Sequence, residues 1–177
     1  MKNLVSIMKD IYLHCSDMQK LADTKNSGLI VFNSAIIIGI TKLAIDFSNH
    51  MCLFFFFMYI ILMCLISIFL NLSSLVAQLR HYEVEAMSFP SENPLFFGKV
   101  SQMKPKELVE NLIKRYDLKE DETGKYEDDM AKQCIIMGQI ALRKFKLFNL
   151  AFLWTIAGIT TPIGALIYAL FYNPNKK

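Results

Sequence analysis

The sequence lacks the residue arrangements on which catalysis and metal binding usually depend. Its 3 histidines lie far apart, and it contains no glycine-rich phosphate loop, serine-nucleophile motif or metal-ligand cluster. The 4 cysteines have neither metal-binding nor redox-motif spacing, so we expect free, buried thiols. The net charge of +3 is too small to indicate a nucleic-acid partner. We therefore expect no enzyme activity, no metal site and no resident cofactor.

Charged residues are scarce in three long apolar runs, which cover residues 28–47, 51–78 and 147–172. A helix rises about 1.5 Å per residue, so about twenty residues cross the roughly 30 Å hydrocarbon core of a bilayer. The pattern predicts an all-α integral membrane protein with three transmembrane helices and a small cytoplasmic helical region. Because the first run begins only after a polar-rich segment, we expect no cleavable signal peptide.

Residues 1–27 are predicted to form an amphipathic helix, because their apolar positions alternate between spacings of four and three. This stripe either packs against the rest of the cytoplasmic part or forms a seam between protomers. The remaining segments follow in order: an antiparallel transmembrane hairpin at 28–78 (spans 28–47 and 51–78), a cytoplasmic linker and helical region at 79–146, a third span at 147–172 and a short tail at 173–177.

Proline marks the expected helix boundaries in the second half of the chain. Two prolines at 90 and 94 exclude regular helix there, whereas Pro105 is suited to the first turn of a new helix. A last helix is expected to begin near Tyr126 and can run unbroken into the third span. Pro162 predicts a kink within that span, which is either static or a hinge for gating.

Lysine and arginine are absent from the connection at 48–50, but they precede the first span and lie at both ends of 79–146. Connections rich in these residues stay on the cytoplasmic side of the membrane. The distribution therefore predicts a multi-pass protein with a cytoplasmic N-terminus and an external C-terminus.

Polar side chains mark the entrance to the first span. Asp23 and Lys25 stand just before it, and Asn33 lies inside it. Such groups are costly in hydrocarbon and usually face a bundle interior or a wet cavity. Asn33 is expected either to form an interhelical hydrogen bond or to line a polar path.

The region 79–146 has equal numbers of basic and acidic residues, so a charge-balanced helical cap is its simplest interpretation. A small anionic ligand would need a few cations and an aromatic ring for stacking. The candidates are Lys25, Lys99, Arg143 and Phe97, because they are expected to cluster at the membrane end of this region. Binding is thus a better prediction than catalysis.

The order of these features resembles a known family. A polar helix leads into the motif Ala22-Asp23-x-Lys25-x-Ser27-x-Leu29 and on to Asn33. A two-span hairpin, a proline-containing linker that ends in Leu95-Phe96-Phe97-Gly98, a helical segment and a final span follow. The whole resembles the transmembrane effector family of bacterial Pycsar anti-phage systems.

The resemblance implies a function. A partner cyclase would make cUMP or cCMP after infection, and this chain, as a homo-oligomer in the bacterial inner membrane, would sense the cyclic nucleotide and impair membrane integrity. The activating ligand would then be the nucleotide, and the outcome abortive infection. Five positions match the family pattern, and the resemblance implies that they bind the ligand, act in gating or hold the bundle together. They are Asp23, Lys25, Asn33, Phe97 and Gly98. Two alternatives stay open: a constitutive holin-like pore-former, and a structural membrane anchor that recruits a partner protein.

Overall fold

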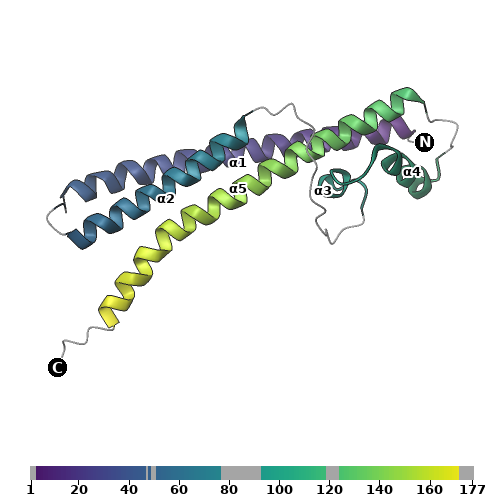
Figure 1. The fold of residues 1–177 in the computed structure, drawn as a ribbon. Helices are drawn as coiled ribbons and strands as arrows, with labels where there is room; N and C mark the ends of the chain where they lie inside the picture. Colours follow the sequence, from purple (N-terminus) through teal and green to yellow (C-terminus); the bar gives the residue numbers. More distant parts are fainter. Residues whose placement is uncertain (1–2, 47, 49–50, 77–92, 119–123, 172–177) are drawn as a thin grey trace. The chain divides into compact units, whose positions relative to one another are not determined.

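The structure is a computed structural model, which describes residues 3–46, 48, 51–76, 93–118 and 124–171. These residues form five helices and no strand: α1 (Leu4–Asp46), α2 (Met51–Leu75), α3 (Phe97–Val100), α4 (Pro105–Tyr116) and α5 (Lys125–Phe171) (Figure 1). The predicted all-α fold is confirmed. The predicted helix start at Pro105 is confirmed as well, and the last helix begins one residue before Tyr126.

Two of the helices are much longer than a single predicted segment. Helix α1 runs for 43 residues through the expected border at residue 28, and α5 runs for 47 residues into the third apolar run. No proline interrupts α1, and no described glycine has a positive φ, so Gly28 does not end the helix. The polar and apolar stretches of α1 thus belong to one continuous helix.

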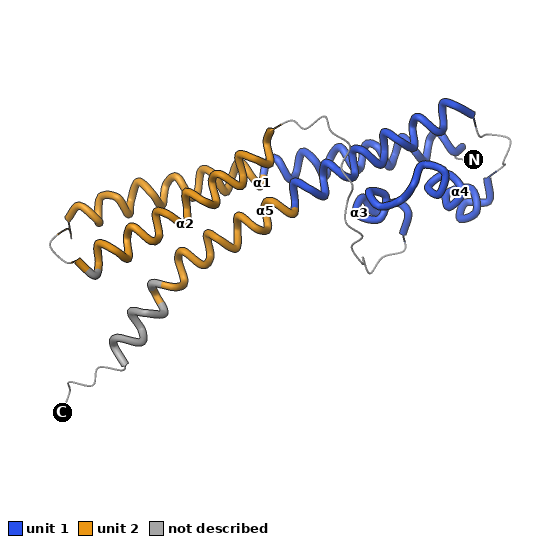
Figure 2. Tube along the Cα trace, in the orientation of Figure 1, with its two compact units in different colours: residues 1–24, 77–145 blue, residues 25–76, 146–177 orange. Residues whose placement is uncertain are grey.

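The contacts divide the chain into two compact units (Figure 2). Unit 1 comprises Met1–Thr24 and Ala77–Phe145, and unit 2 comprises Lys25–Val76 and Lys146–Lys177. Helices α1 and α5 contribute residues to both units.

Unit 1 has a conventional apolar core. The predicted stripe of the N-terminal helix supplies Leu4, Met8, Ile11 and Cys15, which are all buried within one protomer. They pack in one cluster with α4 and α5, whose buried members are Leu108, Val109, Leu112, Ala131, Cys134 and Ile135. The stripe is therefore covered inside the chain, which favours packing over a seam between protomers.

Helix α3 lies very close to α5 in unit 1. A Cβ atom added at Gly138 would lie 3.0 Å from the carbonyl oxygen of Phe97 and 3.4 Å from the backbone nitrogen of Ser101. Gln139 Nε2 also donates a hydrogen bond of 3.2 Å to the carbonyl oxygen of Ser101. The glycine is needed at this position because backbone atoms, unlike side chains, cannot rotate out of the way.

Two thiols in this core give a pH prediction. Burial raises the pKa of Cys15 to about 12 and that of Cys134 to about 11, above the ordinary 9.0. In the unfolded chain both thiols ionise near pH 9, so the stability of unit 1 should fall as the pH rises from about 9 towards 11–12. Denaturant unfolding of the detergent-solubilised protein at pH 8 and pH 10 tests this. A Cys15→Ala/Cys134→Ala variant should show a smaller loss, and an equal loss in both proteins would contradict the prediction.

Unit 2 contains the predicted antiparallel hairpin. Asn26 of α1 bonds to Ser74 of α2, and Asn33 of α1 bonds to Ser67 of α2. From the first bond to the second, the residue number rises from 26 to 33 in α1 and falls from 74 to 67 in α2. The two helices are therefore antiparallel. Helix α1 and the Leu53–Leu75 part of α2 are each long and apolar enough to cross a bilayer.

The third predicted span is not established in the same way. Among the described residues two helices, not three, meet the criteria of length and hydropathy for a membrane span. The segment 147–172 lies in α5 up to Phe171, but the side chain of Pro162 and those from residue 164 onward lie outside the described residues. The kink expected at Pro162 also stays a prediction.

Candidate functional site

The most distinctive feature of unit 2 is a group of buried polar side chains, which we call the polar seam. It begins with three residues from three helices. Asn33 Nδ2 donates to Ser67 Oγ at 2.9 Å, and Thr155 Oγ1 donates to Asn33 Oδ1 at 3.0 Å. The Ser67 and Thr155 hydroxyl oxygens lie 2.9 Å apart. Since a hydroxyl both donates and accepts, the three side chains can form a closed ring in which each donates once and accepts once.

The seam extends along α1 and α2 in one direction from this ring. Asn26 Nδ2 donates to Ser74 Oγ at 3.1 Å, and Asn71 Nδ2 donates to the backbone oxygen of Ser67 at 2.8 Å. Asn71 Oδ1 is buried without a hydrogen-bond partner in the described part of the chain. The polar seam thus consists of six buried, uncharged residues: Asn26, Asn33, Ser67, Asn71, Ser74 and Thr155.

The outside of unit 2 has the opposite character to its interior. Large apolar side chains on all three helices are exposed, among them Val31, Ile38, Phe55, Phe69 and Leu153. A water-soluble protein rarely exposes so much apolar surface, whereas hydrocarbon favours it and drives polar groups to pair inside a bundle. Helices α2 and α5 also pack closely, because a Cβ added at Gly158 would lie 2.8 Å from Met63 Cβ. The surface of unit 2 is therefore suited to the hydrocarbon core of a membrane.

Asp23 has a well-placed partner in unit 1, the side chain of Lys144. Lys144 Nζ donates to both carboxylate oxygens of Asp23, at 2.6 and 2.8 Å, and the Lys144 side chain is only 13% exposed. The exposed pair Lys20–Asp17 has 75% and 65% of its side chains in solvent. Screening by water makes such surface pairs weak. Removal of one partner of the Asp23–Lys144 pair should cost more stability, because it leaves a largely buried charge without its partner.

The other predicted site residues are divided between the units. Lys25 and Asn33 belong to unit 2, where the Lys25 ammonium lies 5.8 Å from the centroid of the Phe148 ring. Phe97, Gly98 and Arg143 belong to unit 1 with Asp23. The cluster of Lys25 and Lys99 with Phe97 and Arg143, expected from the sequence, therefore stays a prediction.

Phe97 is packed among other aromatic rings. Its centroid lies 4.9 Å from that of Phe96 and 5.7 Å from that of Phe145, and the ring packs against the core of unit 1. Gly98 is buried, and its carbonyl oxygen accepts a 2.7 Å hydrogen bond from the Ser101 hydroxyl. These contacts support a structural role for both residues.

Sequence reasoning missed the residues that complete these contacts. Lys144, Ser67 and Thr155 were not candidates, although each bonds directly to a predicted residue. A signal was available for two of them, because serine and threonine inside apolar spans commonly bond across helices. No sequence signal identified Lys144 among the neighbouring cations of α5.

The chain was compared with known proteins. The model of the Pycsar effector protein domain family matches residues 7–171, which include nearly all of the described helices. No curated protein and no solved structure matches the chain. The family consists of transmembrane effectors of anti-phage defence and is not a known catalytic family. The chain therefore belongs to the Pycsar effector protein domain family.

Proposed function

We propose that this chain is a multi-pass membrane effector that impairs the inner membrane when it senses cUMP or cCMP made by a partner cyclase. The observation that carries the proposal is the construction of unit 2, with its polar seam inside and apolar side chains outside. A water-soluble effector would need neither feature. Family membership supplies the anti-phage context.

The membrane arrangement is part of the proposal. With spans at 28–47, 51–78 and 147–172, the N-terminus and residues 79–146 are cytoplasmic in this proposal, as the distribution of lysine and arginine predicts. Unit 1 then contains the residues available to a cytoplasmic nucleotide, and unit 2 those available to lipid. The active form is a homo-oligomer, because three spans are too few to enclose a wide pore.

Binding has to favour the membrane-impairing state, since a ligand with equal affinity for two states shifts nothing. Asp23 and Asn33 act in gating in this proposal, because each is held by a partner on another helix. Lys25, Phe97 and Gly98 support the packing around them. The ligand is then recognised by other side chains of unit 1.

The direct test is dye release from liposomes that contain the purified full-length protein, with a panel of cyclic mono- and dinucleotides. We expect release on addition of cUMP or cCMP and little release without a nucleotide. Equal release with and without nucleotide would instead support the constitutive pore-former. No release under any condition, together with co-purification of a soluble protein, would support the membrane anchor.

A further inference from the structure

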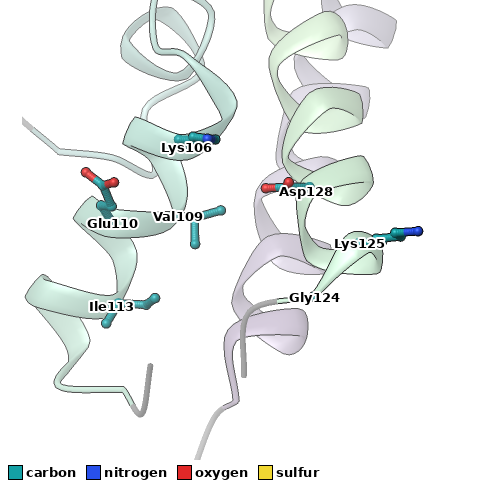
Figure 3. A pocket seen from close by; sticks show the side chains of 7 residues that line it. All are labelled: Lys106, Val109, Glu110, Ile113, Gly124, Lys125 and Asp128. Carbon is teal, nitrogen blue, oxygen red and sulfur yellow. The ribbon is translucent and has the colours of Figure 1, made fainter. Parts of the chain in front are cut away.

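Unit 1 has an open cleft between α4 and the beginning of α5, with a volume of about 640 Å³. This volume lies within the usual range of small-molecule sites, roughly 300–1,000 Å³. Figure 3 shows Lys106 and Val109 on α4, and Asp128 on α5, directed into the space between the helices, whereas Glu110 and Lys125 extend to its outer sides. We call this site the α4–α5 cleft; Ile113 and Gly124 complete its lining.

The lining of the α4–α5 cleft combines two lysines, two carboxylates and two apolar side chains. Lys106 on α4 and Asp128 on α5 are directed into the cleft from opposite walls, and Val109 and Ile113 lie further along the α4 wall. Neither Lys106 nor Asp128 forms an ion pair with any residue that the structure describes. The cleft therefore offers complementary groups to a ligand that has a negative charge, hydrogen-bond donors and a flat apolar surface.

A second cleft in unit 1, of about 440 Å³, is less suited to an anion. It lies beside α1 and is lined by Asp10, Ile11, His14, Asn93, Leu95 and Phe96. Phe96 could stack on a base, but these lining residues include a carboxylate and no lysine or arginine. The described lining of this second cleft thus offers no ammonium or guanidinium group to a phosphodiester, whereas Lys106 is directed into the α4–α5 cleft. The presence of this lysine favours the α4–α5 cleft.

We infer that the α4–α5 cleft binds the cyclic mononucleotide. Lys106 donates to the phosphodiester oxygens, and Asp128 accepts from the ribose 2′-hydroxyl, as acidic residues do in other nucleotide sites. The base and sugar lie on Val109 and Ile113. This inference rests on the proposed function, because it assigns a position to the ligand that the function requires.

The test measures binding of cyclic CMP and cyclic UMP to the full-length protein in detergent by isothermal titration calorimetry. Lys106→Gln and Asp128→Asn should each weaken binding at least about tenfold, since each removes a charge-assisted hydrogen bond. Lys114→Gln and Asp129→Asn are controls with the same chemical changes on the same helices, at residues outside the cleft. Both controls should bind as the unaltered protein does, and Lys106→Arg should retain most of the affinity.

The outcomes separate the cleft from the proposed function. If the unaltered protein binds a nucleotide and the two cleft variants bind it equally well, the assignment of the ligand to the cleft is wrong, but the proposed nucleotide sensing stands. If the unaltered protein binds neither nucleotide, the proposed nucleotide sensing is wrong, and so is the assignment of the ligand to the cleft. If the four charge-neutralising variants all lose affinity equally, the loss is not specific to the cleft, and the assignment of the ligand to the cleft is again wrong. Slow alkylation of Cys15 and Cys134 in each variant verifies that unit 1 is folded.

Discussion

Replacement of Asp23 by lysine should destabilise unit 1 by about 2–3 kcal/mol. The change removes the partner of a Lys144 side chain that is only 13% exposed and places a second ammonium beside it. Cys15 and Cys134 are buried in the same unit, so their alkylation reports how often unit 1 opens. Peptide-level mass spectrometry should show alkylation of both thiols about 30-fold faster or more. Cys64, which is buried in unit 2, should react at an unchanged rate.

The chain offers an internal control and a rescue for this prediction. Asp17→Lys breaks the exposed Lys20–Asp17 pair, and its effect should stay below about 1 kcal/mol. The exchange Asp23→Lys with Lys144→Asp restores opposite charges and should recover most of the protection at Cys15 and Cys134. If the exchanged protein is no better protected than the single variant, the ion pair is not what stabilises unit 1.

Removal of the Thr155 hydroxyl should loosen unit 2 without affecting unit 1. Thr155→Val keeps the side-chain shape but takes away the group that bonds to Asn33 and lies 2.9 Å from Ser67. Interhelical hydrogen bonds in membrane proteins contribute roughly 0.6–2 kcal/mol, and the unpaired Asn33 oxygen adds to the cost. We therefore expect a loss of about 1–2 kcal/mol, seen as roughly tenfold faster alkylation of Cys64 by a membrane-permeant maleimide.

Thr160→Val is the control for this substitution. The Thr160 hydroxyl is exposed and donates at 2.8 Å to the backbone oxygen of Ile156, within its own helix. Its removal should change Cys64 alkylation less than threefold. If Thr155→Val and Thr160→Val accelerate the alkylation of Cys64 equally, the cause is the introduction of valine into α5 and not the loss of hydrogen bonds in the polar seam.

The sequence was sufficient to predict those features that depend on local pattern. The apolar stripe of the N-terminal helix predicted a buried face, and the structure buries Met8 as expected. The short connection after the first span predicted an antiparallel hairpin, which the Asn26–Ser74 and Asn33–Ser67 bonds confirm. In each case a pattern among neighbouring residues was enough to predict the feature.

Features that depend on the pairing of distant residues could not be predicted from the sequence. Asp23 and Lys144 are 121 positions apart, and Arg143 was an equally good candidate by charge alone. Asn33 bonds to Ser67 of α2, although Asn71, one helical turn away, also has a side chain that can form hydrogen bonds. Helix rotation and register decide between such neighbours, and both are set by packing across the whole unit.

The polar seam has a further consequence because none of its members carries a charge. Moving one elementary charge through the membrane potential changes the free energy by about 2.3 kcal/mol per 100 mV. Asparagine, serine and threonine side chains move no net charge when they exchange partners, so rearrangement of the seam is insensitive to voltage.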